Sequence, residues 1–201
     1  MQQTSLAVAA LLLYTAPVFV MLMSLLCFGE AFTRTKALAL LLTFSGCACV
    51  TGVFGSSLTL TLSGLLYGLG SGFGYALYSI FGKYAVRKYS SLTITAYTFY
   101  LALVASWPLA DFDYKRLAAI DLPSIVSVLG LGLLCAVLPY LLYTKGLEHI
   151  EAGQASILAT IEPFVAAAVG VIFFAEALTP LKIIGMGLIF ATIAVLNIRK
   201  A

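Results

Sequence analysis

Residues 14–42 read YTAPVFVMLMSLLCFGEAFTRTKALALLL, and this segment decides the fold because its pattern returns later in the chain. Residues 155–190 read ASILATIEPFVAAAVGVIFFAEALTPLKIIGMGLIF, and the two segments align at an offset of 146 residues without a gap. Apolar composition alone produces leucine, alanine and phenylalanine matches, but it produces matches of other types much less readily. We therefore interpret the segments as two copies of one unit. The informative matches are Pro17 with Pro163, Glu30 with Glu176, Thr33 with Thr179 and Lys36 with Lys182.

The composition around these copies is that of an integral membrane protein. Of the 201 residues, 62% are hydrophobic and 9% are charged, and the mean hydropathy is +1.09. Soluble domains carry roughly 25% charged residues, so the composition excludes both a soluble globular protein and a disordered chain. The net charge of +3 comes from scattered basic residues, which argues against a nucleic-acid partner. Membrane lipid is therefore the expected surrounding.

Long charge-free runs predict about seven transmembrane helices. Crossing the hydrocarbon core takes roughly 20 apolar residues, and the runs do not alternate between apolar and polar residues as barrel strands do. The run 37–82 is too long for one span, and the segment 51–57, rich in glycine and serine, divides it with a turn. The predicted spans are 5–28, 37–53, 59–82, 92–110, 124–145, 152–175 and 181–198.

The basic residues give these spans an orientation. Eight of the eleven Lys and Arg residues fall on one side of the predicted membrane, and that side is expected to be cytoplasmic. The C-terminus is then cytoplasmic and the N-terminus lies outside. The richer side carries Arg34, Lys36, Lys83, Arg87, Lys88, Lys145, Arg199 and Lys200, and the other side carries Lys115, Arg116 and Lys182.

The two copies are expected to be inverted in the membrane. They begin at the first and the sixth predicted span, so an odd number of crossings separates them. Secondary transporters use such inverted repeats and bind their substrates near the midplane where the repeats meet. We predict two segments, residues 1–55 with the last two helices of a first repeat and residues 59–198 with a complete five-helix repeat. Three helices before Met1 would complete the pair.

The segments that carry the repeat resemble the ends of repeats in EamA proteins of the drug/metabolite transporter superfamily. The shared pattern is a helix rich in small residues with a central proline, a glutamate just past its end, a turn with threonine, and a final helix containing glycine. The resemblance implies ten helices in two inverted repeats with both termini cytoplasmic. It implies nothing about the substrate. Compared with the pattern, we expect this chain to lack the first three helices.

Glu162 is the only charged residue deep inside a predicted span. A charge at the centre of a membrane helix costs about 2.5 to 3.5 kcal/mol on insertion scales, and such residues usually face a cavity or a partner. Pro163 follows directly and lacks the N–H that would bond the carbonyl of Ala159. We predict a polar focus in which Glu162 takes up and releases a proton or meets a cationic substrate. The alternative is a protonated glutamate that bridges helices at a proline kink.

Other residues are weaker candidates for the substrate pathway. Buried tyrosine hydroxyls need partners, so a wet cavity lined by tyrosine rings is one interpretation and plain packing is the other. Lys145 is a candidate for attracting anionic substrates, or for reaching the membrane interface with its ammonium group. The repeat-equivalent Pro17, Glu30 and Glu176 are predicted to be structural, with a gate role for the glutamates left open. The candidate tyrosines are Tyr75, Tyr78, Tyr140 and Tyr143.

These observations predict a secondary transporter in the cell membrane that exports small organic metabolites or drugs, with proton coupling. An enzyme is not expected, because the spans hold no aspartate pair, no Ser/His pair and no H-E-x-x-H motif. No cofactor or metal is expected either, since the chain has one histidine and its four cysteines fall inside spans. The alternative is a truncated, non-transporting fragment or a bundle that another polypeptide completes. A homodimer is left open as a further partner.

Overall fold

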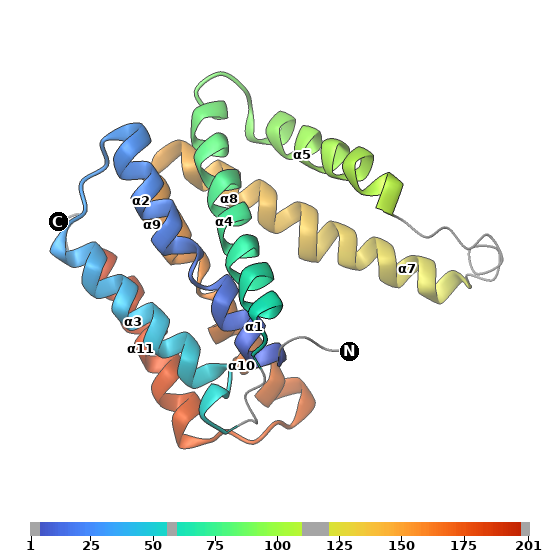
Figure 1. The fold of residues 1–201 in the computed structure, drawn as a ribbon. Coiled ribbons are helices and arrows are strands. Elements are labelled where there is room, and N and C mark those ends of the chain that lie inside the picture. The colour runs from blue at the N-terminus through green and yellow to red at the C-terminus, as the bar shows by residue number, and fades with distance from the viewer. Residues whose placement is uncertain (1–4, 56–59, 110–120, 198–201) are drawn as a thin grey trace. The chain divides into compact units, whose positions relative to one another are not determined.

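The computed structural model describes residues 5–55, 60–109 and 121–197, and in these ranges it confirms the all-helical class expected from the sequence (Figure 1). The chain divides into two compact units. The first unit comprises Met1–Phe81 and Ile150–Ala201, and the second comprises Gly82–His149. Both copies of the repeat therefore fall inside the first unit.

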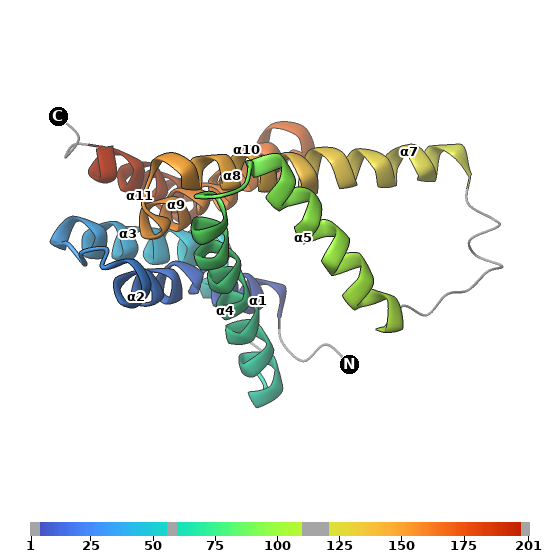
Figure 2. The same ribbon diagram turned by 90° about the horizontal axis from the view of Figure 1, so that it is seen from above.

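The first unit is built from the helices of the two copies and most of α4. The first copy contributes α1 (Leu6–Leu13), α2 (Ala16–Phe28) and α3 (Arg34–Val50), and a short 3-10 turn, Val53–Gly55, follows. The second copy contributes α9 (Ala152–Ala159), α10 (Glu162–Phe174) and α11 (Pro180–Asn197). Seen from above, the helices of each copy form a layer of their own (Figure 2). Helix α4 (Leu62–Ala85) begins in this unit and ends in the second.

The second unit contains the end of α4, helix α5 and one long helical run. Helix α5 (Ser91–Ser106) ends in a 3-10 turn, Trp107–Leu109. The run consists of α7 (Leu122–Gly130), a π-helical segment (Leu131–Val137) and α8 (Leu138–His149). Pro139 follows the π-helical segment and has no N–H for the carbonyl four residues earlier. The N–H of Leu138 instead bonds the carbonyl five residues earlier, at Leu133, which widens the turn.

The helices correspond closely to the predicted spans. Within the described ranges, three runs are long and apolar enough to cross a membrane, namely Ala7–Phe28, Leu122–His149 and Ala152–Phe174. Ser91–Ser106 and Pro180–Leu196 are shorter apolar helices. The predicted span 37–53 is shifted, because Thr33 accepts a hydrogen bond from the backbone N–H of Lys36 and so starts α3 at Arg34. The basic residues Lys115, Arg116, Arg199 and Lys200 lie outside the described residues, and the orientation stays a prediction.

The two copies pack antiparallel, which confirms the expected inversion. Helices α3 and α11 lie side by side in both views (Figures 1 and 2). The hydroxyl of Thr43 donates to that of Thr192 at 3.3 Å, and a Cβ on Gly46 would lie 2.8 Å from Cγ1 of Ile189. Ile189 is the repeat equivalent of Thr43, and Thr192 is that of Gly46. One contact therefore maps onto the other when the copies are exchanged, as a two-fold axis requires.

The copies also share their local breaks and caps. Helices α1 and α9 have the same length and equivalent bounds, and so do α2 and α10. Each copy has a proline in the first turn of its second helix. Both of these helices end in a left-handed residue, Gly29 with φ 66° and Ala175 with φ 52°. The same sequence pattern thus produces the same backbone twice.

The two left-handed caps give a first testable prediction. A non-glycine residue in this conformation is strained by about 1 kcal/mol, so Ala175→Gly should stabilise the protein by about that amount. Gly29→Ala should destabilise it comparably, because a Cβ there meets nothing within 4 Å and only the strain remains. Thermal unfolding in detergent measures both changes. The control is Ala166→Gly inside α10, which should lower stability by about 0.5–1 kcal/mol; destabilisation by all three substitutions would contradict the prediction.

Candidate functional site

The candidate site lies where each copy interrupts its membrane-spanning run. In the first copy α1 ends at Leu13, and the N–H of Thr15 bonds the carbonyl of Leu12 at 3.1 Å. In the second copy α9 ends at Ala159, and the N–H of Ile161 bonds the carbonyl of Leu158 at 3.2 Å. These bonds span three residues instead of four, so the backbone of each copy forms a tighter, 3-10-like turn before its proline. The result is a broken helix in each copy, just before Pro17 and Pro163.

Both breaks line one cavity. Its volume is about 40 Å³, which leaves room for about three water molecules. Residues from the first break face residues from the second across it, and α4 adds one tyrosine. The cavity therefore belongs to both copies, which is where substrate sites of inverted-repeat transporters lie. The lining residues are Leu13, Tyr14, Ala16, Pro17, Tyr75, Ser156, Ala159, Thr160 and Glu162.

Glu162 is the one charged residue among those that line this cavity. It is the first residue of α10, so its carboxylate stands at the positive end of the helix dipole, which favours a negative charge. Ala159 also lines the cavity. Its carbonyl oxygen receives no helical hydrogen bond from position 163, because proline has no N–H. A carboxylate and a carbonyl oxygen at one helix break suit a proton or a cationic group.

Helix α4 approaches the first break closely because of two glycines. A Cβ on Gly68 would lie 2.5 Å from Cδ1 of Leu12, and one on Gly72 would lie 3.1 Å from the hydroxyl oxygen of Thr15. Gly70 and Gly74 have open space at the corresponding position. Of these four glycines, only the two on one face of α4 therefore make tight contacts. This contact brings Tyr75 to the cavity.

Comparison with known proteins identifies the fold that holds this site. The EamA-like transporter family matches residues 1–52 and 62–198, which is nearly the whole chain. The chain belongs to this family. An uncharacterized transporter of Archaeoglobus fulgidus is 34% identical over 199 residues, which cover 96% of this chain and 68% of that protein. The family and its named relatives are transporters.

A relative with a named substrate matches a shorter part of this EamA-like transporter. The threonine/homoserine exporter RhtA of Escherichia coli K12 is 28% identical over 148 residues, which cover 69% of this chain and 47% of RhtA. A solved crystal structure aligns with a TM-score of 0.81 over 98% of this chain and 69% of its own length. Its sequence identity is 16%, so this likeness shows the fold alone. The family match identifies this helical fold as that of a transporter family.

The structure brings only some of the predicted pathway residues together. Glu162 and Tyr75 line the cavity, and so does Pro17, which the sequence assigned a structural role. Pro163 is buried at the second break beside the cavity. Tyr78 lies three residues further along α4, is half-buried, and is not among the lining residues.

The remaining pathway candidates lie on α8 in the second unit. The ring of Tyr140 packs edge-on against Phe99, with 5.3 Å between the ring centres. Tyr143 is half-buried. Lys145 is exposed, and its backbone carbonyl lies 3.1 Å from Nδ1 of His149. The roles predicted for these three residues stay predictions.

Sequence reasoning missed Tyr14 and Thr160, which bring polar groups to the cavity from opposite copies. These two residues are repeat equivalents, each three positions before the central proline of its copy. The alignment of the copies therefore held a signal for them, since both are polar residues at a helix break. An identity search overlooks this pair because tyrosine and threonine differ.

Proposed function

We propose that this protein is a secondary transporter of the cell membrane that exports small organic metabolites or drugs, and that Glu162 carries the coupled proton. The observation that supports the proposal is the meeting of two broken helices around one carboxylate. Burial disfavours the charged form of a carboxyl group, so a site that loses water when it closes favours proton uptake. Closure and opening then change the proton affinity of Glu162, which couples the proton to transport.

The size of the cavity indicates how transport would proceed. About 40 Å³ holds water but no organic solute. A substrate therefore needs an arrangement in which the two copies separate at one end, as in alternating access by rocking of repeats. The named relative exports threonine and homoserine, and both are amino acids with an ammonium group that a carboxylate can bind. We propose an amine-bearing solute as the first substrate class to test.

The membrane side and the partners follow from the same proposal. The bias of basic residues supports a cytoplasmic C-terminus, so export would run from the membrane side predicted to carry Arg34 and Lys145. Lipid and the solute are the proposed partners. A homodimer is proposed as the arrangement to examine if the chain alone is inert.

The test is transport by the 201-residue chain in proteoliposomes across a pH gradient. Threonine is the first probe, followed by a panel of amines, sugars and drugs preselected by thermal stabilisation of the protein. We expect Glu162→Gln to reduce pH-driven transport to the level of empty liposomes, because the amide keeps the size of the side chain but carries no proton. Glu148→Gln, a carboxyl change outside the first unit, should leave transport unchanged.

Two outcomes would overturn parts of the proposal. Unchanged rate and pH dependence in Glu162→Gln would remove Glu162 from the coupling and leave its bridging role at the helix break. A folded wild-type chain that transports no member of the panel would favour the alternative bundle completed by another polypeptide.

A further inference from the structure

A glutamate of the first copy caps a helix of the second copy. The carboxylate of Glu30, just after α2, accepts hydrogen bonds from the backbone N–H groups of Ala152 at 3.0 Å and Gly153 at 3.2 Å. N–H groups in the first turn of a helix have no partner inside their own helix, and the helix dipole favours a negative charge there. Glu151, the residue at the cap position of α9, makes no such bond with its own side chain. Glu30 therefore holds the two copies together.

Lys36 joins the same two copies a second time. Its Nζ donates to the carbonyl oxygen of Ala31 at 2.8 Å and forms an ion pair with the carboxylate of Glu151. The side chain of Lys36 is only 6% exposed. The side chain of Glu151 is 45% exposed, so removing Glu151, rather than Lys36, would leave an uncompensated charge away from water, which is unfavourable. We call Glu30, Lys36 and Glu151 the inter-copy latch.

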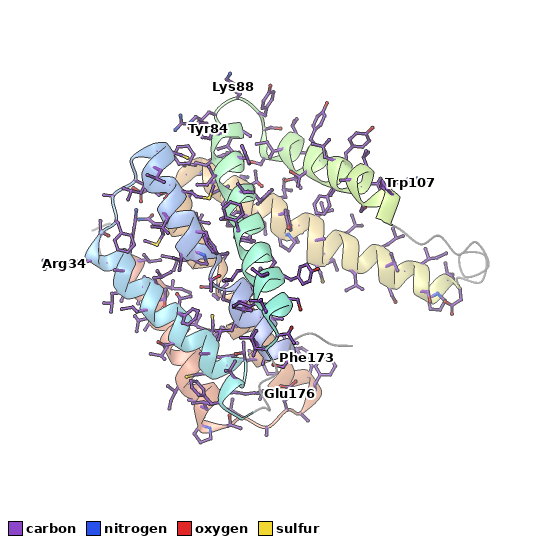
Figure 3. The ribbon with its side chains drawn as sticks, viewed as in Figure 1. Arg34, Tyr84, Lys88, Trp107, Phe173 and Glu176 are labelled. Atoms are coloured by element: carbon purple, nitrogen blue, oxygen red, sulfur yellow. The ribbon has the colours of Figure 1, made fainter. Side chains whose placement is uncertain are left out.

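The repeat equivalents of the latch have other partners. Glu176 corresponds to Glu30 and Lys182 to Lys36, and these two pair with each other at 2.7 Å within the second copy. The carboxyl group of Glu176 lies against its own helix, since a Cβ on Gly170 would be 2.8 Å from its Cδ. Figure 3 shows Glu176 and Arg34, which begins α3 beside the latch, far apart at different ends of the first unit.

Ser5 is the repeat equivalent of Glu151. At the end of the first unit that carries Glu176, the Glu176 end, a serine therefore takes the place of that glutamate. Its hydroxyl oxygen is buried and has no hydrogen-bond partner within the part of the chain that the structure describes. The two ends therefore differ in both charge and connectivity. One end is closed by contacts between copies, and the other end keeps its charged pair within one copy.

We propose that the two ends exchange these arrangements during transport. In the exchanged state Glu30 leaves α9 and pairs with Lys36, while Glu176 leaves Lys182 and caps α1 at Leu6 and Ala7. The inference rests on the proposed alternating access. The exchange keeps one helix capped by a glutamate of the other copy. It changes the number of charged pairs from two, Lys36–Glu151 and Lys182–Glu176, to one, Glu30–Lys36. A packed bundle moves between discrete states of this kind rather than deforming continuously.

The difference between Glu151 and Ser5 sets the resting state. With the latch closed, Lys36 has a carboxylate partner in the other copy. In the exchanged state Lys182 would face a serine at the equivalent place, and no ion pair between copies would form there. The chain without substrate therefore rests with the Glu30 end closed.

Cysteine cross-linking tests this without substrate or proton. In a background with Cys27, Cys47, Cys49 and Cys135 replaced by serine, one variant carries Thr35→Cys with Gln154→Cys. Both positions line a cavity of about 160 Å³ beside the latch. The matched variant carries Val8→Cys with Leu181→Cys, the repeat-equivalent pair at the Glu176 end. A short bifunctional thiol reagent should cross-link the first pair faster than the second.

Glu151→Ser, which copies the equivalent Ser5, removes an ion pair from the closed state alone. It should therefore bring the two rates together, slowing the first pair and accelerating the second. Arg34→Gln is the control for a charge change beside the latch, since Arg34 is exposed and two residues from Lys36, and it should change neither rate. Wild-type rates in the Glu151→Ser variant, as expected for Arg34→Gln, would overturn the latch. Slowing of the first pair without acceleration of the second would overturn the exchange and leave a local structural bond. Monodispersity and thermal unfolding in detergent show that each variant is folded.

The same cross-linking pairs separate this inference from the proposed function. Glu162 is not part of the latch. If proton coupling fails in the transport assays, the exchange measured by cross-linking can therefore still be observed. Conversely, intact pH-driven transport with no exchange of cross-linking rates would overturn the latch alone.

Discussion

Moving the carboxyl group from position 162 to position 16 should preserve pH-driven transport that Glu162→Ala abolishes. The two positions are repeat equivalents, each begins the helix after its break, and both line the same cavity. A carboxylate at position 16 would stand at the N-terminus of α2 as Glu162 stands at that of α10, with the same favourable dipole. The double variant Ala16→Glu with Glu162→Ala should therefore regain most of the pH dependence of the wild type.

The measurement is the transport assay in proteoliposomes at several pH gradients. The control places the carboxyl group one turn into α10, as Ala166→Glu with Glu162→Ala, because Ala166 does not line the cavity. It should stay inactive while remaining folded in a thermal unfolding assay. Activity in both double variants would show that the place of the carboxyl group in the cavity does not matter. Inactivity of a folded Ala16→Glu variant would show that the two breaks are not equivalent in function.

Adding one methyl group at Gly185 should destabilise the protein by about 1–3 kcal/mol. A Cβ there would lie 2.7 Å from Cγ2 of Val50, 2.8 Å from Cβ of Cys49 and 2.8 Å from the carbonyl oxygen of Gly46. The last of these atoms is backbone, so relief requires a shift of α3 against α11. Because α3 and α11 make the broadest contact between the copies, this strain acts on the whole first unit.

The control for this prediction lies two residues away on the same helix. A Cβ on Gly187 meets nothing within 4 Å, so Gly187→Ala should be neutral or stabilise the helix by up to about 1 kcal/mol. Thermal unfolding of both variants in detergent gives the comparison. Equal stability of Gly185→Ala and Gly187→Ala would mean that α3 and α11 are not packed as described.

Local rules explain why the helices could be predicted from the sequence. Each span must pair its own backbone groups in lipid and needs a long apolar run, so charge-free length found the spans without any tertiary information. Caps are local as well, and the equivalent threonines Thr33 and Thr179 start α3 and α11 in the same way. The boundaries that were wrong by a few residues, such as the start of α3, depend on such caps.

The candidate site could be predicted only in part. Glu162 was found because a charge inside a membrane span is costly wherever the helix points. Tyr75 and Tyr78 have the same sequence signal, yet only Tyr75 lines the cavity. The rotation of α4 about its axis decides between them, and that rotation is fixed by the contacts of Gly68 and Gly72 with the first break.

The sequence by itself determined the helical membrane class, the repeat and its inversion, because span length, spacing and the parity of crossings are properties of one chain read in order. Only the tertiary structure decided that the two breaks share a cavity and that Tyr14 and Thr160 line it from opposite copies. It also decided that Glu30 caps α9 and that Lys36 pairs with Glu151. These contacts join residues more than 100 positions apart. They depend on how closely two helices approach and on how each helix is rotated about its axis. The shapes of the side chains that pack against glycines set both quantities, and hydrophobic periodicity does not reveal them.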